Sequence, residues 1–155
     1  MPTEETLNWG DLANTRVGEI EPPKNIPNGH YSAVITGQGK TDNVGQNKTL
    51  VIVFPVRLNE AMDDVDQEAF AASDGFRPKG YEISFYLTSQ SLYRFAEFGK
   101  GMGASNDMNV QELAEYLATC GEEFVVEVSE QTGRRGGKFL QLDNPVPMST
   151  YLENA

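Results

Sequence analysis

Residues Thr49–Leu58 read TLVIVFPVRL, a nearly continuous apolar run. Such a run of β-branched and aromatic residues, with a glycine-rich segment before it and an acidic segment after it, predicts a strand that is buried on both faces or central in its sheet. Pro55 interrupts the run, and a proline cannot donate a hydrogen bond to a neighbouring strand. We therefore expect a bulge, or an unpaired edge position, at Pro55.

Four further segments have the alternation of apolar and polar residues that is typical of half-buried strands. In the first of them, Tyr31, Ala33 and Ile35 share one face. One segment precedes the central run and three follow it: His30–Thr36, Tyr81–Thr88, Phe124–Ser129 and Lys138–Leu142.

A helical region separates the third strand from the fourth. Two sets of apolar residues recur there at helical spacing, one around Phe95 and one after Asn109, and Gly121 follows the second set as a C-terminal cap. The resulting order is strand, strand, strand, helix, strand, strand, which is the order of an OB-fold. We predict a mostly β (α+β) protein: a five-stranded OB-like β-barrel with a helix region between strands three and four.

The 155 residues predict one domain with short flanking segments. Residues 1–27 contain four prolines and scattered apolar residues, and predict an irregular N-terminal arm whose Trp9 either packs on the domain or contacts a partner. The OB-like domain spans residues 28–147 and includes an acidic insertion at 59–79, for which a solvated loop is favoured over a calcium site. Residues 148–155 form a C-terminal tail.

Two glycine-rich loops carry an excess of positive charge. The segments Gly37–Lys48 and Thr132–Lys138 hold five of the chain's 12 basic residues, although the formal net charge is −11. In an OB-fold these loops flank the face that binds oligonucleotides or oligosaccharides. Flexible backbone with local positive charge suits a phosphate-bearing ligand, whereas ordinary solvated turns are the alternative explanation.

The spacing of several short segments resembles the phage-encoded single-stranded-DNA-binding proteins of the OB type. The resemblance covers about residues 8–147 and rests on Trp9-Gly10-Asp11, Pro27-Asn28-Gly29-His30-Tyr31, Lys48-Thr49-Leu50, Phe124-Val125-Val126-Glu127-Val128 and Asn144-Pro145. It implies single-stranded DNA as the ligand, phage replication or recombination proteins as partners, a homo-oligomer, and the cytoplasm of a host cell. The final five residues contain one acid, so they depart from the acidic recruiting tail of such proteins.

Binding of this kind needs cations for the phosphates and exposed aromatic rings for the bases. The candidate phosphate contacts are Lys40, Lys48, Arg57, Arg134, Arg135 and Lys138, and the candidate stacking residues are Tyr31, Tyr86 and Phe139. A core position is the alternative for Tyr31 and Phe139. Tyr86 lies opposite the apolar face of its strand, which favours exposure.

Catalytic chemistry is not indicated. The single His30 has no second histidine or cysteine nearby in the sequence for a metal site, and Cys120 has neither a disulfide partner nor a plausible histidine partner. We expect no cofactor, no membrane span and no secretory signal. The alternative function is a phage structural or protein-interaction component on the same barrel, whose partner docks on the insertion or on the arm.

Overall fold

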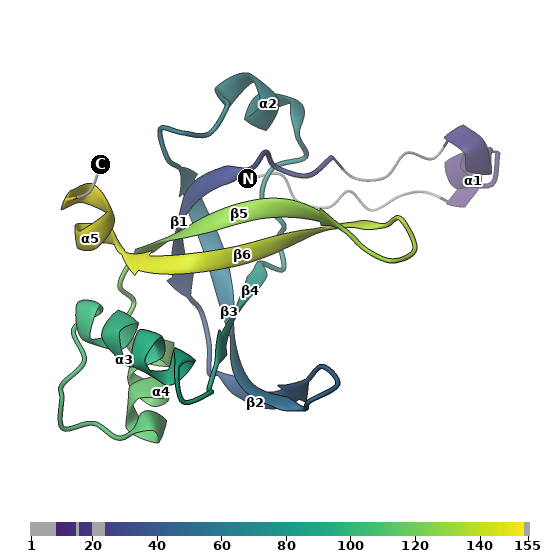
Figure 1. Ribbon diagram of the computed structural model, residues 1–155. Coiled ribbons are helices and arrows are strands. Elements are labelled where there is room, and N and C mark those ends of the chain that lie inside the picture. The colour runs from purple at the N-terminus through teal and green to yellow at the C-terminus, as the bar shows by residue number, and fades with distance from the viewer. Residues whose placement is uncertain (1–8, 15, 20–23, 154–155) are drawn as a thin grey trace.

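The computed structural model describes residues 9–14, 16–19 and 24–153. It is a mostly β α+β fold built on an open antiparallel sheet of six strands (Figure 1). The strands are β1 Gly29–Ile35, β2 Lys40–Val44, β3 Thr49–Ala61, β4 Tyr81–Tyr86, β5 Phe124–Thr132 and β6 Lys138–Pro147. The helices are α1 Trp9–Leu12, the 3-10 helix η1 Val17–Glu19, α2 Gln67–Ala72, α3 Ser91–Gly101, α4 Val110–Thr119 and α5 Met148–Glu153.

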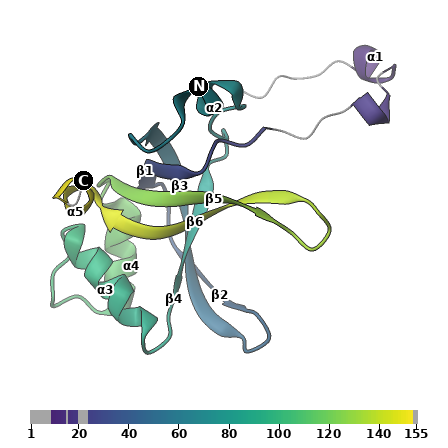
Figure 2. The ribbon, with the colours of Figure 1, turned by 45° about the horizontal axis from the view of Figure 1, so that its top comes forward.

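The long strand β3 organises the sheet, as its apolar sequence predicts. One edge of β3 pairs with β2 and then with β1, while its other edge pairs with β4. From β1 the sheet continues through β5 to β6. The path of hydrogen-bonded neighbours is therefore β2-β3-β1-β5-β6, and β4 lies off this path beside β3. Figure 2 shows how strongly the sheet coils, with the β5–β6 ribbon crossing over β3 and β4.

Pro55 lies where the edge of β3 is interrupted, which confirms the expected irregularity. Ile35 pairs with Val56 and Lys40 pairs with Val53, so residues 36–39 between β1 and β2 face Phe54 and Pro55 without ladder pairing. Only the carbonyl of Pro55 is used there, accepting a hydrogen bond from the Thr36 N–H at 2.9 Å. The missing N–H of proline therefore falls at a gap in the ladder.

The number of strands and the closure of the barrel differ from the sequence prediction. The predicted loop at 37–48 contains β2, so the sheet has six strands and only residues 45–48 turn the chain. Polar residues hid β2 because, as an edge strand, it buries none of its side chains. The predicted barrel is not closed, since the described strands β4 and β6 lie near each other without forming a ladder.

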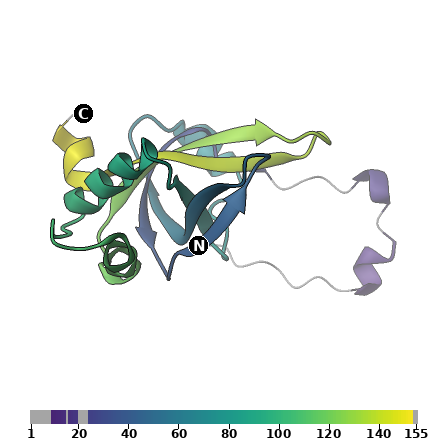
Figure 3. The same ribbon diagram turned by 60° about the horizontal axis from the view of Figure 1, so that its bottom comes forward.

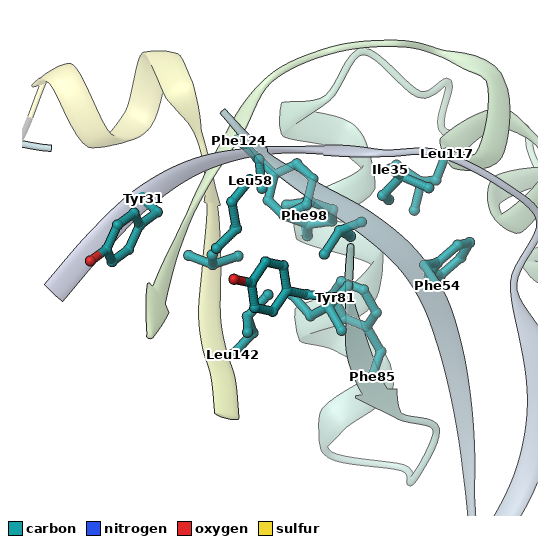
Figure 4. Packing of buried hydrophobic residues seen from close by; sticks show 14 of the residues in the cluster. Tyr31, Ile35, Phe54, Leu58, Tyr81, Phe85, Phe98, Leu117, Phe124 and Leu142 are labelled. Atoms are coloured by element: carbon teal, nitrogen blue, oxygen red, sulfur yellow. The ribbon is translucent and has the colours of Figure 1, made fainter. Parts of the chain in front are cut away.

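The core fills the space between the sheet and the helix pair α3 and α4, as predicted for a helix region between these strands. Aromatic rings from β3, β4, β5 and α3 meet there (Figure 4). Phe85 and Phe95 have ring centroids 4.9 Å apart, and Phe98 meets Phe124 edge-on at 5.2 Å. Such pairs contribute about 0.5–1.5 kcal/mol each beyond the burial of their surface.

The helices begin and end close to the predicted residues. Asn109 caps α4 through a capping box, in which its side chain accepts from the Glu112 N–H at 2.8 Å and the Glu112 carboxylate accepts from the Asn109 N–H at 3.3 Å. Gly121 follows α4 with a φ of 68°, a conformation in which glycine carries no Cβ penalty. Local capping chemistry therefore sets both ends of α4.

The acidic insertion is more ordered than a solvated loop. Residues 59–61 belong to β3, and α2 is capped by the carboxylate of Asp66, which accepts from the Glu68 and Ala69 N–H groups. Val65 is 4% exposed, and Phe70 and Phe76 pack on the core. The larger apolar residues of the insertion therefore extend the core of the open sheet.

The N-terminal arm also differs from its prediction. Trp9 is 78% exposed, so the prediction that its ring packs on the domain is wrong. Val17 is exposed as well, and Ile20, another apolar residue of the arm, lies outside the described residues. At the other end of the chain the predicted tail forms α5, whose Tyr151 ring lies 5.4 Å from that of His30.

Candidate nucleic-acid interface

One face of the β2-β3-β4 sheet points away from the core and carries three of the predicted residues. Residues directly opposite one another in an antiparallel pair share a face. Lys40, Val53 and Ser84 form one such row across the three strands, and Asp42, Val51 and Tyr86 form the next. Lys40 and Tyr86 therefore lie on the same face, with about 10 Å between the outer strands.

Arg57 belongs to the same face, because it lies two and four residues beyond Pro55 and Val53 on β3. Its side chain is exposed, and its Nε donates to Asn59 Oδ1 at 3.2 Å. The outer face thus combines one exposed aromatic ring with a cation on β2 and a cation on β3.

A groove runs along the gap between β4 and β6, which we call the β4–β6 groove. Its cavity volume is about 560 Å³. Tyr86 projects from one wall and Phe139 from the other, with exposed fractions of 52% and 47%. The lining residues are Pro55, Arg77, Lys79, Gly80, Tyr81, Glu82, Ser84, Tyr86 and residues 139–143.

Of the three candidate stacking residues, the structure brings Tyr86 and Phe139 to one groove. Tyr86 alternates with the core residues of β4, and Phe139 alternates with Leu140 and Leu142 on β6. Each ring is therefore held out of the core by the pleat of an ordered strand. The exposure of Phe139 decides against its alternative position in the core.

The groove also contains cations that the sequence interpretation missed. Arg77 and Lys79 line it, balancing Glu82 and Asp143 in a chain whose net charge is −11. Arg77 makes two contacts with Tyr81: its backbone N–H donates to the tyrosine hydroxyl at 3.1 Å, and its guanidinium lies 5.3 Å from the ring centroid. Arg77 and Lys79 were missed because they lie at the end of an insertion dominated by acidic residues. Two cations shortly before a predicted strand were a signal that the sequence offered.

The tips of the two hairpins are exposed but lie outside the groove. Both hairpins extend away from α3 and α4 (Figure 3). Arg134 and Arg135 occupy a turn closed by the Gly133 N–H, which donates to the Gly137 carbonyl at 2.7 Å. Together with Lys48, they do not line the β4–β6 groove, nor does any other described residue of the two turns.

Lys138 is placed differently from its prediction. Its Nζ lies 3.4 Å from Glu130 Oε1, and strand alternation puts it on the face opposite to Phe139. The pKa of Glu130 is held below its ordinary value, mainly by a hydrogen bond from Asn25 and further by Lys138. An exposed lysine paired with a carboxylate is a weaker phosphate contact than a lysine whose charge is unbalanced.

Tyr31 is a core residue, so its prediction as a stacking residue is wrong. It is fully buried, its hydroxyl donates to the Pro27 carbonyl at 2.7 Å, and its ring packs edge-on against Phe76 at 5.9 Å. Burial raises the pKa of its hydroxyl, with smaller contributions from Tyr81 and Asp64. The alternation of β1 directs Tyr31 inward together with Ala33 and Ile35.

Comparison with known proteins gives no identification: no protein-family model and no curated protein matches this chain. The described part of the chain contains no group of three or more His, Cys, Asp or Glu side chains that could hold a metal ion. None of the described helices has the length and apolarity to cross a membrane. The function is therefore inferred from the geometry and charge of the groove.

Proposed function

We propose that this protein binds single-stranded DNA without sequence specificity, through the β4–β6 groove and the outer face of β2-β3-β4. The observation that carries the proposal is the pair Tyr86 and Phe139, two half-exposed rings on opposite walls of one groove. Stacking on exposed aromatic rings contributes about 1–3 kcal/mol per base and is tolerant of sequence. A duplex keeps its base faces stacked, so rings of this kind favour single strands.

The surrounding cations support the same ligand. Arg77 and Lys79 lie in the groove, and Lys40 and Arg57 lie on the adjoining sheet face. Cations that follow the backbone supply the sequence-independent part of nucleic-acid affinity. Lys48, Arg134 and Arg135 on the hairpins would contact phosphates that leave the groove.

The strand order supports an OB-type barrel as the scaffold. Taken together, β1 and β2 act as one strand that bends at residues 36–39, and α3 and α4 fall between β4 and β5. With that equivalence the remaining order matches a five-stranded OB barrel left partly open between β4 and β6. In this proposal the opening is the binding groove, and the resemblance to phage single-strand binders favours a role in DNA replication or recombination.

A second candidate function is a phage structural or protein-interaction component. The exposed side chains of Trp9 and Val17 on the N-terminal arm favour it, because scattered large apolar residues on a short arm suit a protein partner. The insertion is a poorer docking segment than predicted, since its larger apolar residues are turned into the core.

Fluorescence polarisation with labelled single- and double-stranded oligonucleotides tests the proposal. We expect preferred binding of single strands that weakens steeply between about 50 and about 200 mM salt. Replacing Arg77 and Lys79 by alanine removes two phosphate contacts and lowers the slope of log K against log salt by about 1.4. The matched control, Arg16→Ala with Lys24→Ala, removes the same charge outside the groove and leaves the slope unchanged.

Absence of binding at low salt would refute the proposal, as would binding that does not respond to salt. Equal affinity for duplex and single strand would refute the role assigned to the aromatic rings. Unaltered oligonucleotide binding by the Arg77→Ala, Lys79→Ala variant would place the site elsewhere on the surface.

A further inference from the structure

A second groove lies between α3 and β6, and we propose that it carries the continuation of the same single strand. This inference rests on the function proposed above. We call this the α3–β6 groove; its cavity volume is about 930 Å³. Its lining includes Tyr93, Arg94 and Lys100 from α3 and the segment Asn144–Pro147 from β6.

The two grooves are continuous. Ser84, Tyr86 and Asp143 line both of them, so Tyr86 stands at their junction. The chain passes from β4 directly into α3, which places the α3 residues beyond Tyr86 along the same path. A strand that stacks on Tyr86 is therefore led from one groove into the other.

The side chains of α3 repeat the chemistry of the first groove. Tyr93 is 69% exposed, which leaves most of its ring available for a base. Arg94 follows it directly, is exposed, and makes no ion pair with any residue that the structure describes. An arginine without a carboxylate partner can contact a phosphate or stack its guanidinium plane on a base.

Lys100 and the β6 wall complete the groove in different ways. Lys100 lies 3.3 Å from Glu97, one helical turn earlier, so part of its charge is balanced within α3. The opposite wall contains Pro145, Val146 and Pro147, which offer an apolar surface to the faces of bases or sugars. The groove thus has two exposed aromatic rings, Tyr86 and Tyr93, one unpaired cation and one apolar wall, which suits a nucleic acid better than an acidic or basic peptide.

The α3–β6 groove should contribute to binding affinity only when the oligonucleotide is long enough to reach it. OB-type domains cover about 4–16 nucleotides, so the shortest oligonucleotides fill only the β4–β6 groove and longer ones reach α3. We expect Tyr93→Ala with Arg94→Ala to weaken binding of the longest oligothymidylate by about 5- to 150-fold, the equivalent of one lost stack. The shortest oligothymidylate that the native protein binds should be bound equally well by both proteins.

The experiment is a polarisation titration of oligothymidylates from about 4 to about 16 nucleotides with the native chain and the double variant. Tyr93→Phe is the matched control and should retain full affinity at every length, and thermal melting confirms that each variant is folded. An equal loss at all lengths, or no loss at any length, would overturn the inference. If the native chain binds no oligothymidylate of any length, the proposed function itself fails, a result distinguishable from both.

Discussion

Replacing Tyr86 by alanine is the sharpest perturbation of the proposed site, because this ring belongs to both grooves. Its exposed half is the part available to a base, and the loss of one stack costs about 1–3 kcal/mol. Affinity for single-stranded DNA should therefore fall by about 5- to 150-fold. Both short and long oligonucleotides should be affected, unlike with the substitutions in α3.

The same substitution has a separate cost to stability that can be estimated. Tyr86 lies directly opposite Val51, which is 2% exposed although it is on the outer face, so the buried half of the tyrosine covers the valine. Burying a large apolar side chain completely contributes about 1.5–3 kcal/mol. Half of that burial makes the loss about 1 kcal/mol, which lowers Tm by about 2–4 °C in a domain of this size.

Two measurements separate these effects: polarisation titration at a temperature well below unfolding, and thermal melting without DNA. Tyr86→Phe keeps the ring and should match the native protein in affinity, since the tyrosine hydroxyl is not required for stacking. A folded Tyr86→Ala variant with native affinity would refute the role of Tyr86. A large loss of affinity in Tyr86→Phe would show that the hydroxyl, rather than the ring, makes the contact.

Three further predictions concern stability. Gly80→Ala should lower the free energy of unfolding by about 1–3 kcal/mol, because φ is 77° there and an added Cβ would lie 2.6 Å from the Val56 carbonyl oxygen. An unchanged midpoint of urea denaturation would contradict this. Leu117→Ala should cost about 2–5 kcal/mol in the same assay, since this side chain is fully buried. The pKa of Asp64 lies below its ordinary value of 3.8. Desolvation is the largest single influence and raises this pKa, but the hydrogen bonds and charge of His30 together lower it by more. The stability that this carboxylate provides is present above pH 3.8 and is lost as the pH falls through the lowered value, so Asp64→Asn should show a shallower loss in acid denaturation, and parallel curves would argue against it.

The sequence predicted the parts of the fold that local patterns determine. The apolar run of β3, the alternation of β4 and the capping residues of α4 each specify their own element. Strand β2 was missed because an edge strand needs no apolar side chains, and its pairing depends on β3 rather than on its own sequence. Barrel closure was predicted from the order of elements, but whether two edge strands form a ladder depends on the coiling of the whole sheet.

The candidate site was predicted where strand alternation decides orientation. Tyr86 and Phe139 are exposed because their neighbours on β4 and β6 are buried, a pattern visible in the sequence. Alternation equally directs Tyr31 inward, and the core alternative for that residue was the correct one. Arg77 was missed because its position depends on where the insertion rejoins the sheet, a contact between segments that are distant in the sequence.

The opening between β4 and β6 has a consequence for how the protein behaves without a ligand. Among the described strands, each of these two leaves one edge without a ladder partner, and an unpaired edge presents a row of amide and carbonyl groups to any other extended chain. Charged side chains such as Lys79 and Glu82 beside this edge oppose the addition of a foreign strand. A nucleic acid in the groove would cover both edges. Ligand binding and self-association of the empty protein would therefore compete for the same surface.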